Sequence, residues 1–278
     1  SADQLIQRLV SEGDNSPADI LLTVDAGRLE RAKSAGILQP VKSKTLIKNI
    51  PNEMRDEDGY WFGLTVRSRV IIYSPDRVNF DELSTYEDLT NPRWKGRIVA
   101  RSSNNIYNQS LLASLIIANG RENALDWAKE VRKNMARSPR GSDRDQIRAV
   151  ASGLADIAIA NTYYLGILAN SSKKADREVA SKVSVFFPNQ RDRGSHINVS
   201  GGGVTSSSKN KDEAIQFLEF LSNSESQEIF GKVNYEYPVK IEKNKSGLLR
   251  SWGRFKADKV SLSLLGKKNS EAVKLFDL

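Results

Sequence analysis

Three tyrosines stand at positions where chemistry can occur. Tyr163 and Tyr164 directly follow an apolar run at 155–160, and Tyr107 follows a second predicted strand at 97–100. In α/β proteins, ligands bind where the carboxyl end of a strand meets the next helix. Neither junction has the glycine spacing of a phosphate-binding loop. A tyrosine at a helix start can also simply pack with its hydroxyl in water, so position alone leaves both interpretations open.

The chemistry that three phenols can do together is to coordinate a hard, highly charged cation. A free phenol keeps its proton up to pH about 10, but a bound cation lowers that value sharply. Three phenolates balance a 3+ charge. A fourth phenolate would leave a net charge of −1, which a nearby arginine can offset. Fe(III) is the abundant biological cation that fits, because hard ions prefer oxygen ligands and tyrosinate is a known ligand of iron.

The composition excludes most other metal chemistry. The 278 residues include no cysteine and one histidine. The missing cysteines exclude disulfides, thiolate zinc sites, iron–sulfur clusters and cysteine nucleophiles. His196 is the one position for any Ser-His-Asp relay; it lies in a loop-like stretch, where a solvated or structural role is expected. Oxygen ligands from Asp, Glu and Tyr remain.

Weaker candidates lie elsewhere in the chain. Arg67 and Arg69, inside a predicted strand at 60–73, can supply a guanidinium to an anion, although surface charge is the simpler interpretation of either. Asp143 and Asp145 are typical helix-start acids. The glycines at 201–203 indicate a bulge or crossover that would suit a hinge.

The net charge of +8 is local, because residues 240–278 carry six of these positive charges. A solvated surface is the favoured interpretation; docking on an acidic partner or a membrane surface, and nucleic-acid binding, are the alternatives. The longest apolar run, 111–118, is far too short for a membrane span. No signal-peptide pattern opens the chain, so we expect a mature or trimmed product.

Hydrophobic periodicity and turn residues define the elements that must position these side chains. Strands alternate with helices, which predicts an α/β fold with largely parallel sheets. No strand precedes the first helix, so a sheet built from this segment would lack its first strand. We expect helices at 5–10, 28–35, 107–119, 121–135, 143–151, 162–169, 211–221, 225–233 and 270–276, and strands at 20–24, 60–73, 97–100, 155–160, 183–187 and 197–204, with Thr162 and Asn269 as helix caps.

Seven motifs spread along the chain make it resemble the periplasmic ferric-ion-binding proteins of ABC importers, in particular their tyrosine-rich cyanobacterial branch. The tyrosine pair in its context is fairly specific, whereas the KDEA and WKG motifs occur in other solute-binding proteins. The motifs are SPAD (16–19), RSRV (67–70), NPRWKGR (91–97), NTYY (161–164), SGG (200–202), KNKDEA (209–214) and EYP (236–238).

The resemblance implies a two-lobed α/β fold of the type II periplasmic-binding-protein class, with strands that cross between the lobes. It implies an N-terminal lobe of residues 1–67 and 203–250 and a C-terminal lobe of residues 68–202 and 251–278. The implied function is that of a monomeric, non-enzymatic periplasmic receptor. Such a receptor captures Fe(III) in the cleft between its lobes and delivers it to an ABC permease, without binding nucleic acid.

The resemblance also assigns residues. The adjacent tyrosines of the family match Tyr163 and Tyr164, and Tyr107 matches the ligand of the branch that coordinates iron without an exogenous anion. Arg67 matches an arginine that neutralises charge near the iron. Relatives that use a carboxylate and an anion carry a Glu that would align with Val24, and a small-residue loop that would align with 103–105.

One departure concerns the beginning of the chain. Family members carry a further ligand, a Tyr often preceded by His, at the end of an upstream strand, and nothing in residues 1–15 matches it. We therefore expect that the first few dozen residues of the mature protein are missing. Two other functions stay open: a receptor for an oxyanion or small organic anion that uses Arg67, Ser103 and the backbone at 104–105, and an enzyme with a tyrosine nucleophile acting on nucleic acid.

Overall fold

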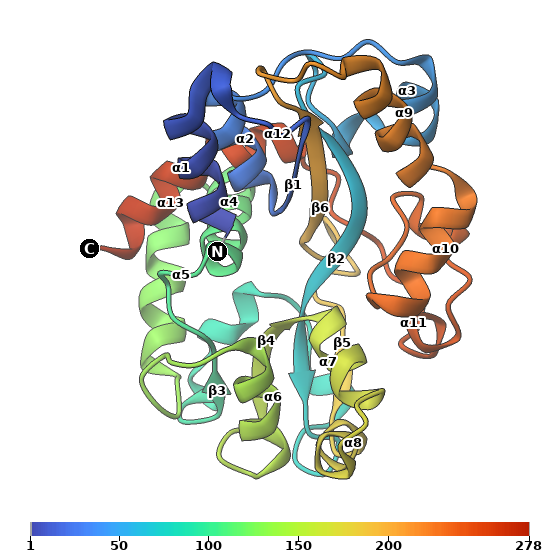
Figure 1. Cartoon of the computed structure of the whole chain (residues 1–278). Helices are drawn as coiled ribbons and strands as arrows, with labels where there is room; N and C mark the ends of the chain where they lie inside the picture. The colour runs from blue at the N-terminus through green and yellow to red at the C-terminus, as the bar shows by residue number, and fades with distance from the viewer. Residues whose placement is uncertain (1, 278) are drawn as a thin grey trace. The chain divides into compact units, whose positions relative to one another are not determined.

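The computed structural model describes residues 2–277 and divides them into two compact units, which we treat separately (Figure 1). Unit 1 comprises residues 2–66, 198–245 and 260–269. Unit 2 comprises residues 67–197, 246–259 and 270–277. In the described part of the chain, no helix combines the length and apolar composition needed to cross a membrane.

The expected lobe boundaries differ from these units in four places, the smallest being Arg67, which belongs to unit 2. Residues 198–202 belong to unit 1, where residues 200–202 pair with β1 (Ile20–Val24) and Ser200 lies opposite Val24. Residues 260–269 also belong to unit 1, since α12 (Leu262–Lys267) packs on α2 (Ala26–Ser34). Residues 246–250 belong to unit 2. The chain therefore passes between the units more often than the sequence suggested.

Unit 1 is built around two antiparallel strands. β1 pairs in continuous register with β6 (Ile197–Val204), whose first residue lies in unit 2. The first five residues of β2 (Phe62–Tyr73) also belong to this unit. The helices of the unit, besides α2 and α12, are α1 (Ala2–Glu12), α3 (Lys44–Asn49), α9 (Lys211–Leu221) and α10 (Ser224–Val233).

The three glycines of β6 allow neighbouring backbone to approach closely. A Cβ on Gly203 would lie 2.2 Å from the carbonyl oxygen of Tyr60, and one on Gly201 would lie 2.4 Å from that of Phe62. The pairing with β1 runs without interruption from Ser200 to Val204. The glycines therefore form no bulge in this pairing, whereas the alternative of a crossover agrees with the passage of β6 from unit 2 into unit 1. The glycines are needed because a side chain would have no space.

Unit 2 has a sheet centred on the second half of β2. That strand pairs antiparallel with β4 (Ile157–Asn161) and with β5 (Ser184–Phe186), and β3 (Ile98–Val99) pairs parallel with β4. The helices are α4 (Ile106–Asn119), α5 (Arg121–Lys133), α6 (Asp143–Ala151), α7 (Thr162–Ala169), α8 (Lys174–Ser181), α11 (Gly247–Ser251) and most of α13 (Asn269–Phe276).

The predicted elements largely coincide with the observed ones, but the predicted strand directions do not. Of the pairings described here, only β3 with β4 is parallel, and the prediction of largely parallel sheets is wrong. Parallel neighbours need a crossover connection, usually a helix. β2 instead carries the chain from unit 1 into unit 2 and enters the second sheet antiparallel to β4.

Candidate metal centre

Tyr107 lies in the first turn of α4. The helix starts there because the side chain of Asn105 accepts a hydrogen bond from the Tyr107 backbone N–H at 3.0 Å, an N-cap interaction. The helix is then anchored by a continuous buried run from Ser110 to Ile116. The phenol is thus attached to a rigid element, the helix that follows β3 in the chain.

Tyr163 and Tyr164 lie in the first turn of α7, directly after β4. Asn161 is the N-cap residue and Thr162 is the first helical residue, fully buried, so the predicted capping role of Thr162 is wrong. The two tyrosine rings pack against each other with their centroids 4.2 Å apart. Adjacent side chains diverge around a regular helix, but at this first turn both rings stay together.

The three tyrosines lie close together in unit 2. The hydroxyl of Tyr163 donates a hydrogen bond to the hydroxyl oxygen of Tyr107, with 3.2 Å between the two oxygens. Around an octahedral ion with oxygen ligands at about 2 Å, neighbouring oxygens lie about 3 Å apart. The two oxygens therefore already have the spacing of two ligands of one ion.

Burial keeps Tyr163 and Tyr164 protonated when no ion is present. It raises the pKa of Tyr163 far above its usual value, and the neighbouring Tyr107 and Tyr164 raise it further, while Arg67 opposes the shift. Burial and Tyr107 also raise the pKa of Tyr164, with Arg101 acting in the opposite direction. A cation must therefore displace phenolic protons in order to bind.

Two arginines flank the ring of Tyr107. The guanidinium carbon of Arg67 lies 5.5 Å from the ring centroid, and that of Arg101 lies 5.4 Å from it. Arg67 is only 1% exposed, which excludes a surface role. Sequence reasoning missed Arg101; its place directly after the predicted strand at 97–100, beside the Tyr107 junction, was the available signal.

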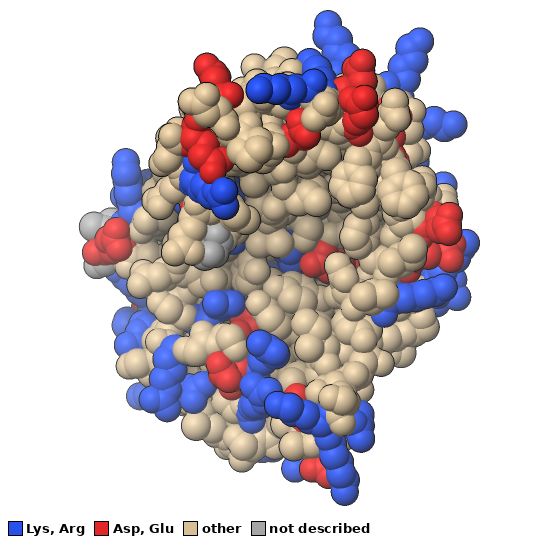
Figure 2. Space-filling view, in the orientation of Figure 1, with Lys and Arg blue, Asp and Glu red and all other residues tan. Residues whose placement is uncertain are grey.

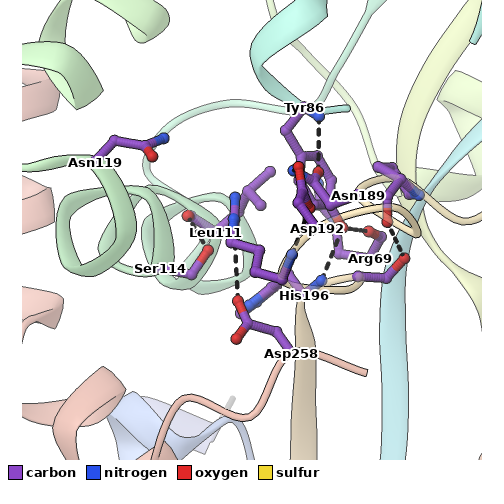
Figure 3. Close-up of polar contacts among 12 residues, drawn as sticks. Arg69, Tyr86, Leu111, Ser114, Asn119, Asn189, Asp192, His196 and Asp258 are labelled. Atoms are coloured by element: carbon purple, nitrogen blue, oxygen red, sulfur yellow. Dashed lines mark hydrogen bonds and ion pairs between the residues drawn. The ribbon is translucent and has the colours of Figure 1, made fainter. Parts of the chain in front are cut away.

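Arg69, the other arginine of the predicted strand, is also buried rather than on the surface. Its backbone carbonyl accepts a hydrogen bond from the hydroxyl of Tyr86, and that hydroxyl accepts one from the His196 backbone N–H at 3.1 Å (Figure 3). His196 is 3% exposed, so the solvated role is excluded and a structural one remains. Burial, with Arg193, Arg69 and Arg67, lowers the pKa of His196 to about 3.

The candidates for anion binding at 103–105 take part in local hydrogen bonds around the start of α4. Ser103 accepts a hydrogen bond from the side chain of Gln109 through its carbonyl, and Asn105 caps α4. In the described chain, no group of three or more His, Cys, Asp and Glu side chains could hold a metal ion. The phenols of unit 2 are therefore the metal-binding candidates.

The positive charge of residues 240–278 does not form one basic surface in the structure. The basic residues at 240–278 are divided between both units. In Figure 2, lysines and arginines gather over α6 and α8 of unit 2. Arg144, Lys173, Lys174 and Arg177 are exposed there.

Comparisons with known proteins agree with one another. The family model described as bacterial extracellular solute-binding protein matches residues 15–256. The chain is 51% identical to iron uptake protein A1 of Synechocystis, over 99% of this chain and 77% of that protein. It is 28% identical to the major ferric iron-binding protein of Neisseria meningitidis, over 96% and 79%.

Two solved structures extend this similarity to the fold. One is Trichodesmium IdiA (FutA) in complex with iron and citrate ligands, at 53% identity and a TM-score of 0.97, covering 100% of this chain and 88% of that one. The other is a ferric binding protein from Campylobacter jejuni, at 44% identity and a TM-score of 0.94, with the same coverage. The α/β fold expected from the resemblance is confirmed.

Proposed function

Because the chain belongs to the family of bacterial extracellular solute-binding proteins, we propose that it is a periplasmic receptor that binds Fe(III) through phenolate oxygens of Tyr107, Tyr163 and Tyr164. It delivers the ion to an ABC-type permease and acts as a monomer without catalysing a reaction. Relatives named for iron uptake or ferric binding support the ion, and the family supports the transport role.

The observation that supports this ligand set best is the 3.2 Å contact between the hydroxyls of Tyr163 and Tyr107. Two half-buried phenols in contact gain little from each other beyond one hydrogen bond, but as phenolates they would repel each other unless a cation lay between them. A trivalent cation balances three phenolates. Arg67 and Arg101, near the ring of Tyr107, favour negative charge at the same place.

Capture then consists of exchanging protons for iron. The ion approaches the three phenols, and a phenol loses its proton as its oxygen becomes a ligand. The hard oxygen donors favour Fe(III) over softer ions. Three phenolates leave further coordination positions for other ligands.

Spectroscopy tests this proposal directly. Adding Fe(III) as its nitrilotriacetate complex should produce a visible tyrosinate-to-iron charge-transfer band and colour the protein red or purple. Tyr163→Phe should weaken the band, because one donor oxygen is removed. Tyr60→Phe, in unit 1, is the matched control and should leave the band unchanged. A colourless protein after loading would overturn the proposal.

A specific observation also favours the alternative of an anion receptor. The Nε atom of Arg101 is buried and lacks a hydrogen-bond partner among the described residues, so it can donate to an oxyanion. Calorimetry with phosphate, sulfate and citrate in the absence of iron distinguishes the two functions. Heat of binding without iron would favour the anion receptor, whereas binding that requires iron would favour the ferric receptor.

A further inference from the structure

Asp143 is a fully buried carboxylate that the capping of its own helix does not explain. It is the first residue of α6 and is 0% exposed. The cap of that helix is made by Ser142 and Asp145, which exchange hydrogen bonds in a capping box. Burying a carboxylate costs several kcal/mol unless it is paired and hydrogen-bonded. The partners of Asp143 therefore indicate what the residue does.

These partners come from the segments that carry the tyrosines. One carboxylate oxygen, Oδ2, accepts the backbone N–H of Asn161 at 2.9 Å and Nη1 of Arg69 at 3.0 Å. The other, Oδ1, lies 3.6 Å from Nη1 of Arg101. Asn161 is the N-cap residue of α7 and stands two positions before Tyr163. Arg101 flanks the ring of Tyr107.

Arg69 connects the same carboxylate to the start of α4. Its guanidinium donates to the side-chain oxygen of Asn161 at 3.2 Å, and its Nε donates to the side-chain oxygen of Asn108 at 3.1 Å. Asn108, the residue after Tyr107, donates in turn to the carbonyl oxygen of Arg101 at 2.7 Å. The starts of both tyrosine-bearing helices are thus fixed to one buried ion pair.

We propose that Asp143 is the positioning residue of the tyrosine site: its carboxylate sets the distance between the phenol of Tyr107 and the phenols of Tyr163 and Tyr164. The proposal rests on the proposed function, and Asp143 itself does not touch the ion. A carboxylate is required because Oδ2 accepts hydrogen bonds from Arg69 and a backbone N–H, while Oδ1 carries the negative charge that pairs with Arg101. An amide would turn an NH₂ group towards Arg69 or Arg101 and lose one of these contacts.

The test compares Asp143→Asn with Asp145→Asn, its neighbour on the same helix. Groups that orient metal ligands typically change metal affinity by about 10- to 100-fold when they are mutated. We expect Asp143→Asn to lower the Fe(III) affinity, measured by competition with citrate, by at least about 10-fold. The charge-transfer band should also shift in wavelength. Asp145→Asn should keep the wild-type affinity and band, although it loosens the helix cap.

A measurement without iron separates positioning from general destabilisation. In Asp143→Asn, hydrogen exchange should accelerate at the amides of residues 161–164 more than in the core of α4, whereas a general loss of stability would accelerate both. If this variant does not fold, Arg101→Gln removes the more exposed contact, with an expected shift of the same band.

The outcomes also separate this proposal from the proposed function. A wild-type protein without a band refutes the ferric site, and the positioning role with it. If the wild type shows the band, the variant decides the positioning role alone. A folded Asp143→Asn protein, or its substitute Arg101→Gln, with wild-type affinity and an unshifted band would overturn that role.

Discussion

The hydroxyl of Tyr163 lies 3.2 Å from the hydroxyl of Tyr107, although 56 residues separate the two in the chain. Both residues lie in the first turn of a helix, α4 or α7, and these helices follow β3 and β4, which pair in parallel. Parallel neighbours end at the same edge of a sheet, so the helices that follow them begin side by side. Pairing of the two strands thereby brings the phenols together.

Because Tyr163 and Tyr164 are protonated before binding, iron loading should release protons. Burial raises the pKa of Tyr163 and of Tyr164, so both hold their protons throughout the neutral range. Each phenol that becomes a ligand loses one proton, and Fe(III) affinity should therefore rise with pH, by up to about 10³-fold per pH unit for three ligands. Calorimetry in buffers of different ionisation enthalpy counts the protons, after correction for the chelator that delivers the iron. A count unaffected by Tyr163→Phe would contradict the ligand set.

The buried His196 should destabilise the protein in acid. Its pKa falls from 6.5 to about 3 on folding, so between these values the unfolded chain binds a proton that the folded protein does not. The free energy of unfolding is unaffected by this group above pH 6.5 and decreases as the pH falls towards 3, by about 1.4 kcal/mol per pH unit.

Urea unfolding of the wild type and of His196→Gln at about pH 6 and about pH 4 measures this dependence. Carboxylates titrate in both proteins, so only the difference between them reports on the histidine. The wild type should lose more stability than the variant on acidification. Equal losses would mean that His196 becomes protonated in the folded state within this range.

Arg193 should contribute strongly to the stability of unit 2. Its guanidinium pairs with Glu87 at 3.0 Å and with Asp258 at 2.9 Å, and Asp258 is largely buried. Arg193→Met would remove the guanidinium that pairs with this largely buried carboxylate, at a cost of about 3 kcal/mol. Arg121→Met, which breaks the exposed ion pair with Glu122, is the control and should hardly change the unfolding midpoint. Equal effects of the two variants would refute the assignment.

Gly203→Ala should destabilise unit 1 by about 2–3 kcal/mol, because the added Cβ would lie 2.2 Å from the Tyr60 carbonyl oxygen. Gly247→Ala provides the comparison, since no heavy atom lies within 4 Å of its Cβ position. Thermal unfolding of both variants measures the effect. A stable Gly203→Ala protein would show that β6 and the segment at Tyr60 can move apart.

Much of the fold could be predicted because hydrophobic periodicity and caps are local signals. The bounds of α6, α7, β6 and α9 coincide with the predicted ranges. Strand direction could not be predicted, because it depends on which strands become neighbours. Nor could the role of the glycines in β6, since a bulge and a close approach of backbone have the same sequence pattern.

For the site, the sequence by itself limited the ligands that the chain can offer. Without cysteine and with one histidine, these are almost entirely oxygen atoms, and the three tyrosines follow strands in the order that places them at helix starts. The tertiary structure alone decided which charges surround them. Arg67, Arg69 and Asp143 look like surface or helix-end residues in the sequence, yet all three are buried beside the phenols. Burial and charge pairing arise between segments distant in the chain, and no local pattern encodes them.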